Sequence, residues 1–126
     1  MNTQDLVTQI VTSLDKHKAQ DIRVLRVTEV SSLADYFVIA AGSSSTQVRA
    51  LSDYTEFELG RQGMHPHNIE GYQTSLWTLL DYGTVVVHIF QEQTRDFYDL
   101  ERLWQDAEEL DAMTFVDNGG QDNEEV

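Results

Sequence analysis

The feature that most limits the fold of this chain is a short apolar run without alternation, from Tyr36 to Ala41 (YFVIAA). A strand with one face in water alternates apolar and polar residues, whereas a strand covered on both faces reads as a continuous apolar run. Gly42 ends the run, and three serines follow it. We therefore predict a central strand here, and the rest of the chain has to supply the elements that cover both of its faces.

Helices are predicted on either side of this strand. Apolar residues at helical spacing indicate a helix over roughly residues 4–18 and a second helix that ends before Gly63. Thr94 is the expected cap of a third helix. The apolar face of that third helix comprises Phe97, Leu100 and Trp104.

Further strands complete the prediction. One is expected after Ile22, and two more at Ser75–Asp81 and Val85–Phe90, while residues 64–68 are expected to form a loop around the only proline. The link Tyr82-Gly83-Thr84 is short enough for a hairpin, so the last two strands should be antiparallel neighbours. The order helix, strand, strand, helix, strand, strand, helix predicts an α/β domain with a mixed β-sheet and packed helices.

Acidic residues are concentrated at the C-terminal end. The chain of 126 residues is long enough for one domain, and its formal net charge is −14. Eight acids and no Lys or Arg follow Trp104, so residues 1–104 carry −6. We expect residues 1–104 to form a single α/β domain and residues 105–126 to be an acidic, largely disordered tail. The residues that would still pack locally as a short extension are Leu110, Met113, Phe115 and Val116.

Charge and composition narrow the functional classes. An acidic surface repels phosphate backbones, so we expect no direct nucleic-acid recognition, and a basic protein is the better partner. The sequence has no cysteine, which excludes disulfides and thiolate chemistry. No apolar run approaches the roughly 20 residues that cross a bilayer, and the N-terminus does not resemble a secretory signal. We expect a cytoplasmic protein that does not bind membranes.

Two stretches are candidate ligand sites. Gly42-Ser43-Ser44-Ser45 lies where a strand ends and a helix begins, a place where backbone amides bind phosphate. Nucleotidyltransferase chemistry would also need two carboxylates one residue apart on the next strand, but Asp53-Tyr54-Thr55 lies in a helix and lacks the second acid. We interpret Gly42–Ser45 as a helix cap. His65 and His67 lack the further ligands that zinc requires, so no metal or cofactor is predicted.

His88 is the strongest candidate for a catalytic group. Strand alternation puts it on the same face as Val86 and Phe90. A general base needs a positioned acid and a nucleophile within reach, and the sequence offers no such motif. We interpret His88 as a histidine whose hydrogen bond is satisfied by a neighbour on a sheet face.

Trp77 is the strongest candidate for a binding residue. It shares one strand face with Leu79 and Asp81, and the opposite face carries Leu76, Thr78, Leu80 and Tyr82. An aromatic anchor beside a charged neighbour is typical of binding hot spots. The alternative is that Trp77 lies beneath a helix, and the alternation pattern leaves both interpretations open.

Four stretches together carry a family resemblance. They are DYFVIAAGSSS (35–45), EG (70–71), WTLLDYGTVVVHIF (77–90) and RDFYDLERLW (95–104). In this order and spacing they resemble the ribosomal silencing factors, over about residues 3–104. The DYG, VVVH and YxLExLW patterns are far more specific jointly than singly.

The resemblance implies an α/β fold related to nucleotidyltransferases but without their catalytic carboxylates, in a protein that is not an enzyme. Members of the family bind large-subunit ribosomal protein fourteen where the two subunits meet. They sterically block joining of the small subunit, which lowers translation when nutrients are short. The same role is therefore expected of this chain.

The expected partner-binding residues follow from the strand pattern and the resemblance together. Trp77 would be the anchor, and Asp81 would meet a basic side chain of the ribosomal protein. Tyr82 and Gly83 would let the turn approach closely. The residues expected to border the patch are His88 and Tyr98, with Glu70 and Arg95 as lesser candidates that support the turn.

Three other possibilities stay open at this stage. An exposed patch of Trp77 and Tyr82 would allow homodimers to form away from the ribosome. A degenerate nucleotidyltransferase would still bind a nucleotide at Gly42–Ser45. An adaptor would use the same surface for a different basic protein.

Overall fold

The computed structural model describes residues 2–32, 34–94, 102 and 105–116. Its helices are α1 (Thr3–Lys16) and α2 (Ser45–Gly60), with a short 3₁₀ helix η1 (Ala112–Phe115) near the end. Its strands are β1 (Gln20–Arg26), β2 (Tyr36–Gly42), β3 (Asn68–Glu70), β4 (Trp77–Asp81), β5 (Val85–Gln91) and β6 (Glu108–Leu110). No helix within this described part is long and apolar enough to span a bilayer.

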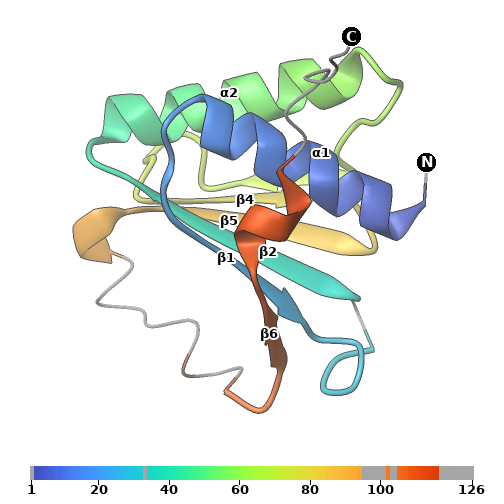
Figure 1. Ribbon diagram of the computed structural model, residues 1–126. Helices are drawn as coiled ribbons and strands as arrows, with labels where there is room; N and C mark the ends of the chain where they lie inside the picture. Colours follow the sequence, from blue (N-terminus) through green and yellow to red (C-terminus); the bar gives the residue numbers. More distant parts are fainter. Residues whose placement is uncertain (1, 33, 95–101, 103–104, 117–126) are drawn as a thin grey trace, which may run out of the picture.

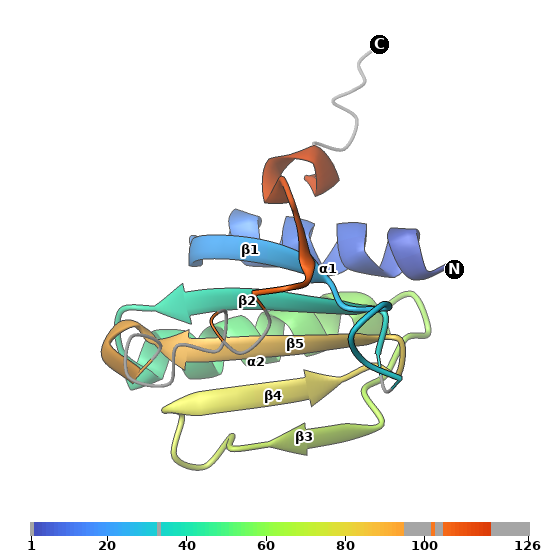
Figure 2. The ribbon, with the colours of Figure 1, turned by 90° about the horizontal axis from the view of Figure 1, so that it is seen from below.

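The strands form one mixed sheet in the order β3-β4-β5-β2-β1-β6 (Figure 2). Strands β2 and β5 pair in parallel at the centre, and every other pair is antiparallel. The parallel pair requires the chain to cross over between them, and α2 lies in that connection. The predicted mixed sheet and the β4–β5 hairpin are both confirmed.

The two faces of the sheet have different covers. Helices α1 and α2 lie side by side on one face, which we call the helix face (Figure 1). The opposite face, which we call the outer face, carries a second apolar cluster that includes Phe37, Ile39 and Phe90. Every residue of β2 is buried, so the prediction of a strand covered on both faces is confirmed.

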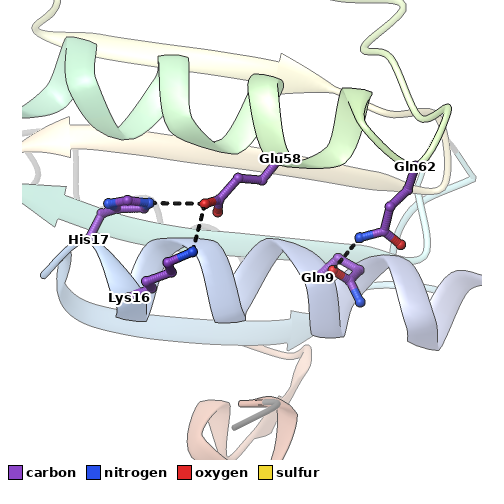
Figure 3. A network of polar contacts seen from close by, with 5 residues as sticks. All are labelled: Gln9, Lys16, His17, Glu58 and Gln62. Atoms are coloured by element: carbon purple, nitrogen blue, oxygen red, sulfur yellow. Dashed lines mark hydrogen bonds and ion pairs between the residues drawn. The ribbon is translucent and has the colours of Figure 1, made fainter. Parts of the chain in front are cut away.

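Local interactions start both long helices and hold them together. The side chain of Asn2 accepts from the Asp5 amide at 2.8 Å and caps α1, and Ser44 caps α2 in the same way. Between the helices the Glu58 carboxylate accepts from Lys16 at 3.1 Å and lies 3.3 Å from His17 Nε2 (Figure 3). Burial raises the pKa of Glu58, but the hydrogen bonds from its partners outweigh burial and lower the pKa overall.

Three short elements differ from the prediction. Strand β3 begins at the end of the expected loop and forms one edge of the sheet. Strand β6 and η1 lie beyond the expected domain boundary at residue 104. The expected short extension is confirmed for Leu110, Phe115 and Val116, which pack against the core, while Met113 is exposed. The expected third helix after Thr94 and the end of the tail, residues 117–126, lie outside the described residues.

Acidic residues help to attach β6 to the sheet. The Arg23 guanidinium donates from Nε to Glu109 at 2.8 Å, and Arg26 lies 3.6 Å from Glu108. Glu108 and Glu109 are thus partners of β1 rather than part of a featureless acidic tail. A three-residue strand provides too little alternation to be recognised in the sequence.

Candidate docking face

The hairpin β4–β5 and the edge strand β3 build a small grid of side chains on the outer face. Antiparallel pairing sets Glu70 opposite Leu79, and Leu79 in turn opposite His88. Trp77 pairs with Phe90 on one side of this row, and Asp81 pairs with Val86 on the other. Since alternate residues of a strand share a face, Leu79 lies at the centre of the grid. We call these outer-face residues of β3 and β4 the docking face: Glu70, Trp77, Leu79 and Asp81.

Trp77 is held from two directions. Its ring stacks on Phe90 with the centroids 4.9 Å apart and the planes inclined by 25°. Its Nε1–H donates to His88 Nδ1 at 3.1 Å. The side chain is still only half-buried, and it lies on the face opposite the two long helices. The indole is therefore both fixed in orientation and accessible, which are the properties of a binding anchor.

His88 is buried, with only 4% of its surface exposed. Burial lowers its pKa to about 4, so the imidazole is neutral near pH 7. A neutral ring that accepts at Nδ1 carries its proton on Nε2, and this atom has no hydrogen-bond partner among the described residues. The interpretation that a neighbour satisfies His88 is confirmed for Nδ1. Its expected place at the border of the patch is corrected, because His88 lies beneath Trp77.

A hollow opens beside Trp77. Its volume is about 220 Å³, and it is lined by Glu70, Gly71, Trp77 and Leu79. Gly71 has a φ of +77°, and a Cβ there would lie 2.0 Å from the Trp77 carbonyl oxygen. Only glycine fits this position, because the chain turns sharply past the start of β4. The absent side chain thus lets the backbone at Gly71 pass close to the start of β4.

Asp81 and Gly83 shape the turn at the other end of β4. The Asp81 carboxylate accepts from the Gly83 amide at 2.8 Å, and the Asp81 carbonyl accepts from the His67 amide at 2.7 Å. Gly83 has a φ of +89°, which favours glycine. One carboxylate thus caps the turn, and it makes no ion pair within the described residues.

One of the expected contact residues, Tyr82, is not on this face. Tyr82 is 4% exposed and belongs to the core beneath the helices. Burial raises the pKa of its hydroxyl well above the usual range. Tyr82 is therefore corrected to a core residue, and a self-association patch of Trp77 and Tyr82 is not available. Tyr98 and Arg95 lie outside the described residues.

The Gly42–Ser45 stretch is a helix cap, as predicted. Ser44 accepts from the Gln47 amide at 3.1 Å. The Gln47 side chain in turn accepts from both the amide and the hydroxyl of Ser43, at 2.6 and 2.9 Å. The Ser43 amide, one of the groups that would face a phosphate, therefore already has a partner within the chain. Among the described residues no group of three or more His, Asp or Glu is placed to hold a metal.

Leu79 belongs to the docking face and Gly71 lines its hollow, although neither was among the expected site residues. Leu79 was assigned to the correct strand face by alternation, so its neighbourhood with Trp77 and Asp81 was already predicted. Gly71 had a weaker signal, a glycine directly after Glu70 in the stretch that carries the resemblance. Its role depends on a close backbone approach that periodicity does not encode.

A family model and several known proteins are similar to this chain. The family described as "Ribosomal silencing factor during starvation" matches residues 1–125. The "Ribosomal silencing factor RsfS" of Halalkalibacterium halodurans is 37% identical over 107 residues, which cover 85% of this chain and 92% of that protein. The mouse protein named "Mitochondrial assembly of ribosomal large subunit protein 1" is 32% identical over 78% of this chain and 44% of its own length.

A solved structure has the same fold. The crystal structure of protein CV0518 from Chromobacterium violaceum superposes with a TM-score of 0.81 at 33% sequence identity. The superposition covers 83% of this chain and 88% of that one.

Proposed function

The chain belongs to the ribosomal silencing factor family, and from this premise we propose that it binds the large ribosomal subunit through the docking face. Its contact there is large-subunit protein fourteen, at the surface where the two subunits meet. The bound protein blocks joining of the small subunit and so represses translation when nutrients are short. It acts in the cytoplasm, by binding alone and without a catalytic step. Its fold is related to that of the nucleotidyltransferases.

The observation that carries the proposal is the state of Trp77. A half-buried indole that is stacked on Phe90 and hydrogen-bonded to His88 has lost most of its rotational freedom before any partner arrives. Ordering a side chain at an interface costs about 0.5–1.5 kcal/mol, and here the fold has already met much of that cost. Tryptophan in this condition is the commonest kind of interface hot spot.

Charge supports a basic partner. Glu70 and Asp81 lie on the docking face, and none of the described residues that line the hollow beside Trp77 is a Lys or Arg. The whole chain carries −14, a field that would speed the encounter with a basic ribosomal protein. It would also repel bare ribosomal RNA, so the protein component of the subunit is the favoured contact.

The name of the mouse relative supports the choice of subunit, since it refers to assembly of the large subunit. Blocking then needs only geometry. If the docking face and the small subunit require the same area of the large subunit, binding of one excludes the other, and the coupling between them is reciprocal.

Nucleotide binding at Gly42–Ser45 is the weaker alternative, because the Ser43 amide is already hydrogen-bonded to the Gln47 side chain.

The test is the affinity of purified protein for separated large subunits. Trp77→Ala is expected to weaken binding by roughly 2 kcal/mol, about thirtyfold. The matched control is Phe57→Ala, which removes an aromatic ring of α2 that is 63% exposed. The control should bind like the wild type. Equal affinity of a folded Trp77→Ala protein would remove the docking face from the proposal.

A further inference from the structure

We infer that His88 is a positioning residue: it touches no partner, and it sets the orientation in which Trp77 meets the large subunit. This inference deepens the proposed function and rests on it for the identity of the partner. The hydrogen bond itself belongs to the folded protein and can be measured without ribosomes.

Three features of the described residues surround the indole. One ring face is occupied by Phe90, at 4.9 Å between centroids. The Nε1–H edge is occupied by His88, at 3.1 Å. The hollow of about 220 Å³ lies beside what remains. Compared with the stacking on Phe90, the hydrogen bond to His88 has a defined direction, because a stacked pair tolerates sliding and rotation in its plane.

The position of His88 is itself fixed. Its ring packs edge-on against Phe37, with centroids 4.7 Å apart at an interplanar angle of 61°. Phe37 comes from β2, the central strand of the sheet, and β2 pairs directly with β5. His88 is thus held by a residue of the central strand, and in turn it holds the indole of Trp77 on β4.

A purely structural role explains the choice of histidine poorly. Burying an imidazole costs free energy relative to an apolar side chain of the same size, and Nε2 of His88 recovers nothing from the described residues. A leucine or phenylalanine would fill the space between Phe37 and Phe90 at lower cost. What histidine adds is one acceptor directed at the indole, which satisfies the indole N–H and at the same time fixes the orientation of Trp77.

Two substitutions separate the effect of the hydrogen-bond acceptor at position 88 from the effect of the volume of the side chain. In His88→Asn the side-chain oxygen can occupy a place close to that of Nδ1, which keeps an acceptor for the indole. In His88→Leu the apolar bulk remains and the acceptor is lost. Leucine should stabilise the fold at least as well as asparagine. If His88 acts only through stability, His88→Leu should therefore be the milder variant, whereas if it acts through the hydrogen bond, His88→Asn should be the milder one.

The first readout is the indole N–H resonance of Trp77 in a nitrogen-15 correlation spectrum. The chain has two tryptophans, and the resonance missing from Trp77→Phe assigns Trp77. We expect slow hydrogen exchange and a downfield shift in the wild type and in His88→Asn, and their loss in His88→Leu. A resonance unchanged in His88→Leu would overturn the inference, whatever the ribosome experiments show.

The second readout is binding to large subunits in a double-mutant cycle. His88→Leu is expected to weaken binding about fivefold to tenfold, with His88→Asn closer to the wild type. In the Trp77→Phe background, which has no indole donor, His88→Leu should change binding less than twofold. Equal losses in both backgrounds would contradict positioning through Trp77. If the wild type does not bind large subunits, the proposed function fails while the spectrum still decides the hydrogen bond.

Discussion

The two faces of strand β4 differ in burial, although their residues alternate along five positions of one chain segment. On the helix face Thr78 and Leu80 are completely buried. On the outer face Trp77, Leu79 and Asp81 are each half-buried. The helix face packs under α2 and holds the fold together, while the outer face keeps an aromatic, an aliphatic and an acidic side chain within reach of a partner.

This contrast separates stability from binding. Burying a leucine completely is worth about 1.5–3 kcal/mol, so residues on the helix face contribute as much as their type allows. Trp77 and Leu79 have not used all of their apolar surface in folding, and the remainder is available at an interface. Substitutions on the helix face should therefore change the free energy of unfolding, and substitutions on the outer face should mainly change affinity.

The largest effect is expected at Leu80. Leu80→Ala would leave a cavity in the core under the helices and lower the free energy of unfolding by roughly 2–5 kcal/mol. The measurement is urea denaturation followed by circular dichroism. Large-subunit binding of the fraction that remains folded should be unchanged. If the folded fraction of Leu80→Ala bound more weakly than the wild type, the helix face would also affect binding, and the proposed division between stability and binding would be wrong.

Acid should weaken the fold through His88. The group binds a proton with a pKa of 6.5 when unfolded and about 4 when folded, so the unfolded state takes up more protons between these values. The contribution of His88 to the free energy of unfolding is fully present above about pH 6.5. As the pH drops towards 4, the free energy of unfolding falls by roughly 2–4 kcal/mol. In His88→Leu this contribution is absent. Wild-type and His88→Leu stabilities that change in parallel over this range would contradict the assignment.

A glycine pair tests the hollow. Gly71→Ala would put a Cβ 2.0 Å from the Trp77 carbonyl, so the backbone before β4 has to move. We expect a loss of roughly 1–3 kcal/mol in stability and a weaker affinity, because Trp77 moves with its strand. Gly63→Ala is the matched control, since Gly63 has a φ of +82° but no atom within 4 Å of an added Cβ. Gly63→Ala should lower the stability through backbone strain but leave the affinity for large subunits unchanged.

The smallest effect is expected from the charge on the turn. Asp81→Asn keeps an oxygen that accepts from the Gly83 amide, so the turn should persist. Loss of the charge is expected to weaken binding about fivefold, which is roughly 1 kcal/mol, and to reduce its dependence on salt. Glu56→Gln, which changes an exposed acid on α2, is the control. An identical salt dependence for wild type and Asp81→Asn would remove Asp81 from the interface.

The sequence predicted the layers of this fold better than its edges. The continuous run in β2 and the alternation in β4 match the burial of these strands, so the residues that share a face with Trp77 were predicted correctly. Which of the two faces of β4 is exposed was left open by the sequence. Strands β3 and β6 have three residues each, too few for a period to emerge. They form at the sheet edges because a neighbouring strand offers hydrogen bonds.

The site was predictable in part for the same reason. The alternation that buries Leu80 also buries Tyr82, so the assignment of Tyr82 to the interface went against its own strand pattern. The bond from Trp77 to His88 joins residues on paired strands, and only the register of the hairpin brings them together. The burial of His88, and with it its neutral state, likewise comes from tertiary packing that the residue types alone do not give.

The most direct test of the proposed function is subunit joining. Purified protein is added to separated large subunits, small subunits follow, and the joined fraction is read by sedimentation. Wild-type protein should co-sediment with large subunits and lower the joined fraction, and Trp77→Ala should do neither at the same concentration. Co-sedimentation with full joining would contradict the blocking mechanism, and no co-sedimentation at low or moderate salt would contradict the docking itself.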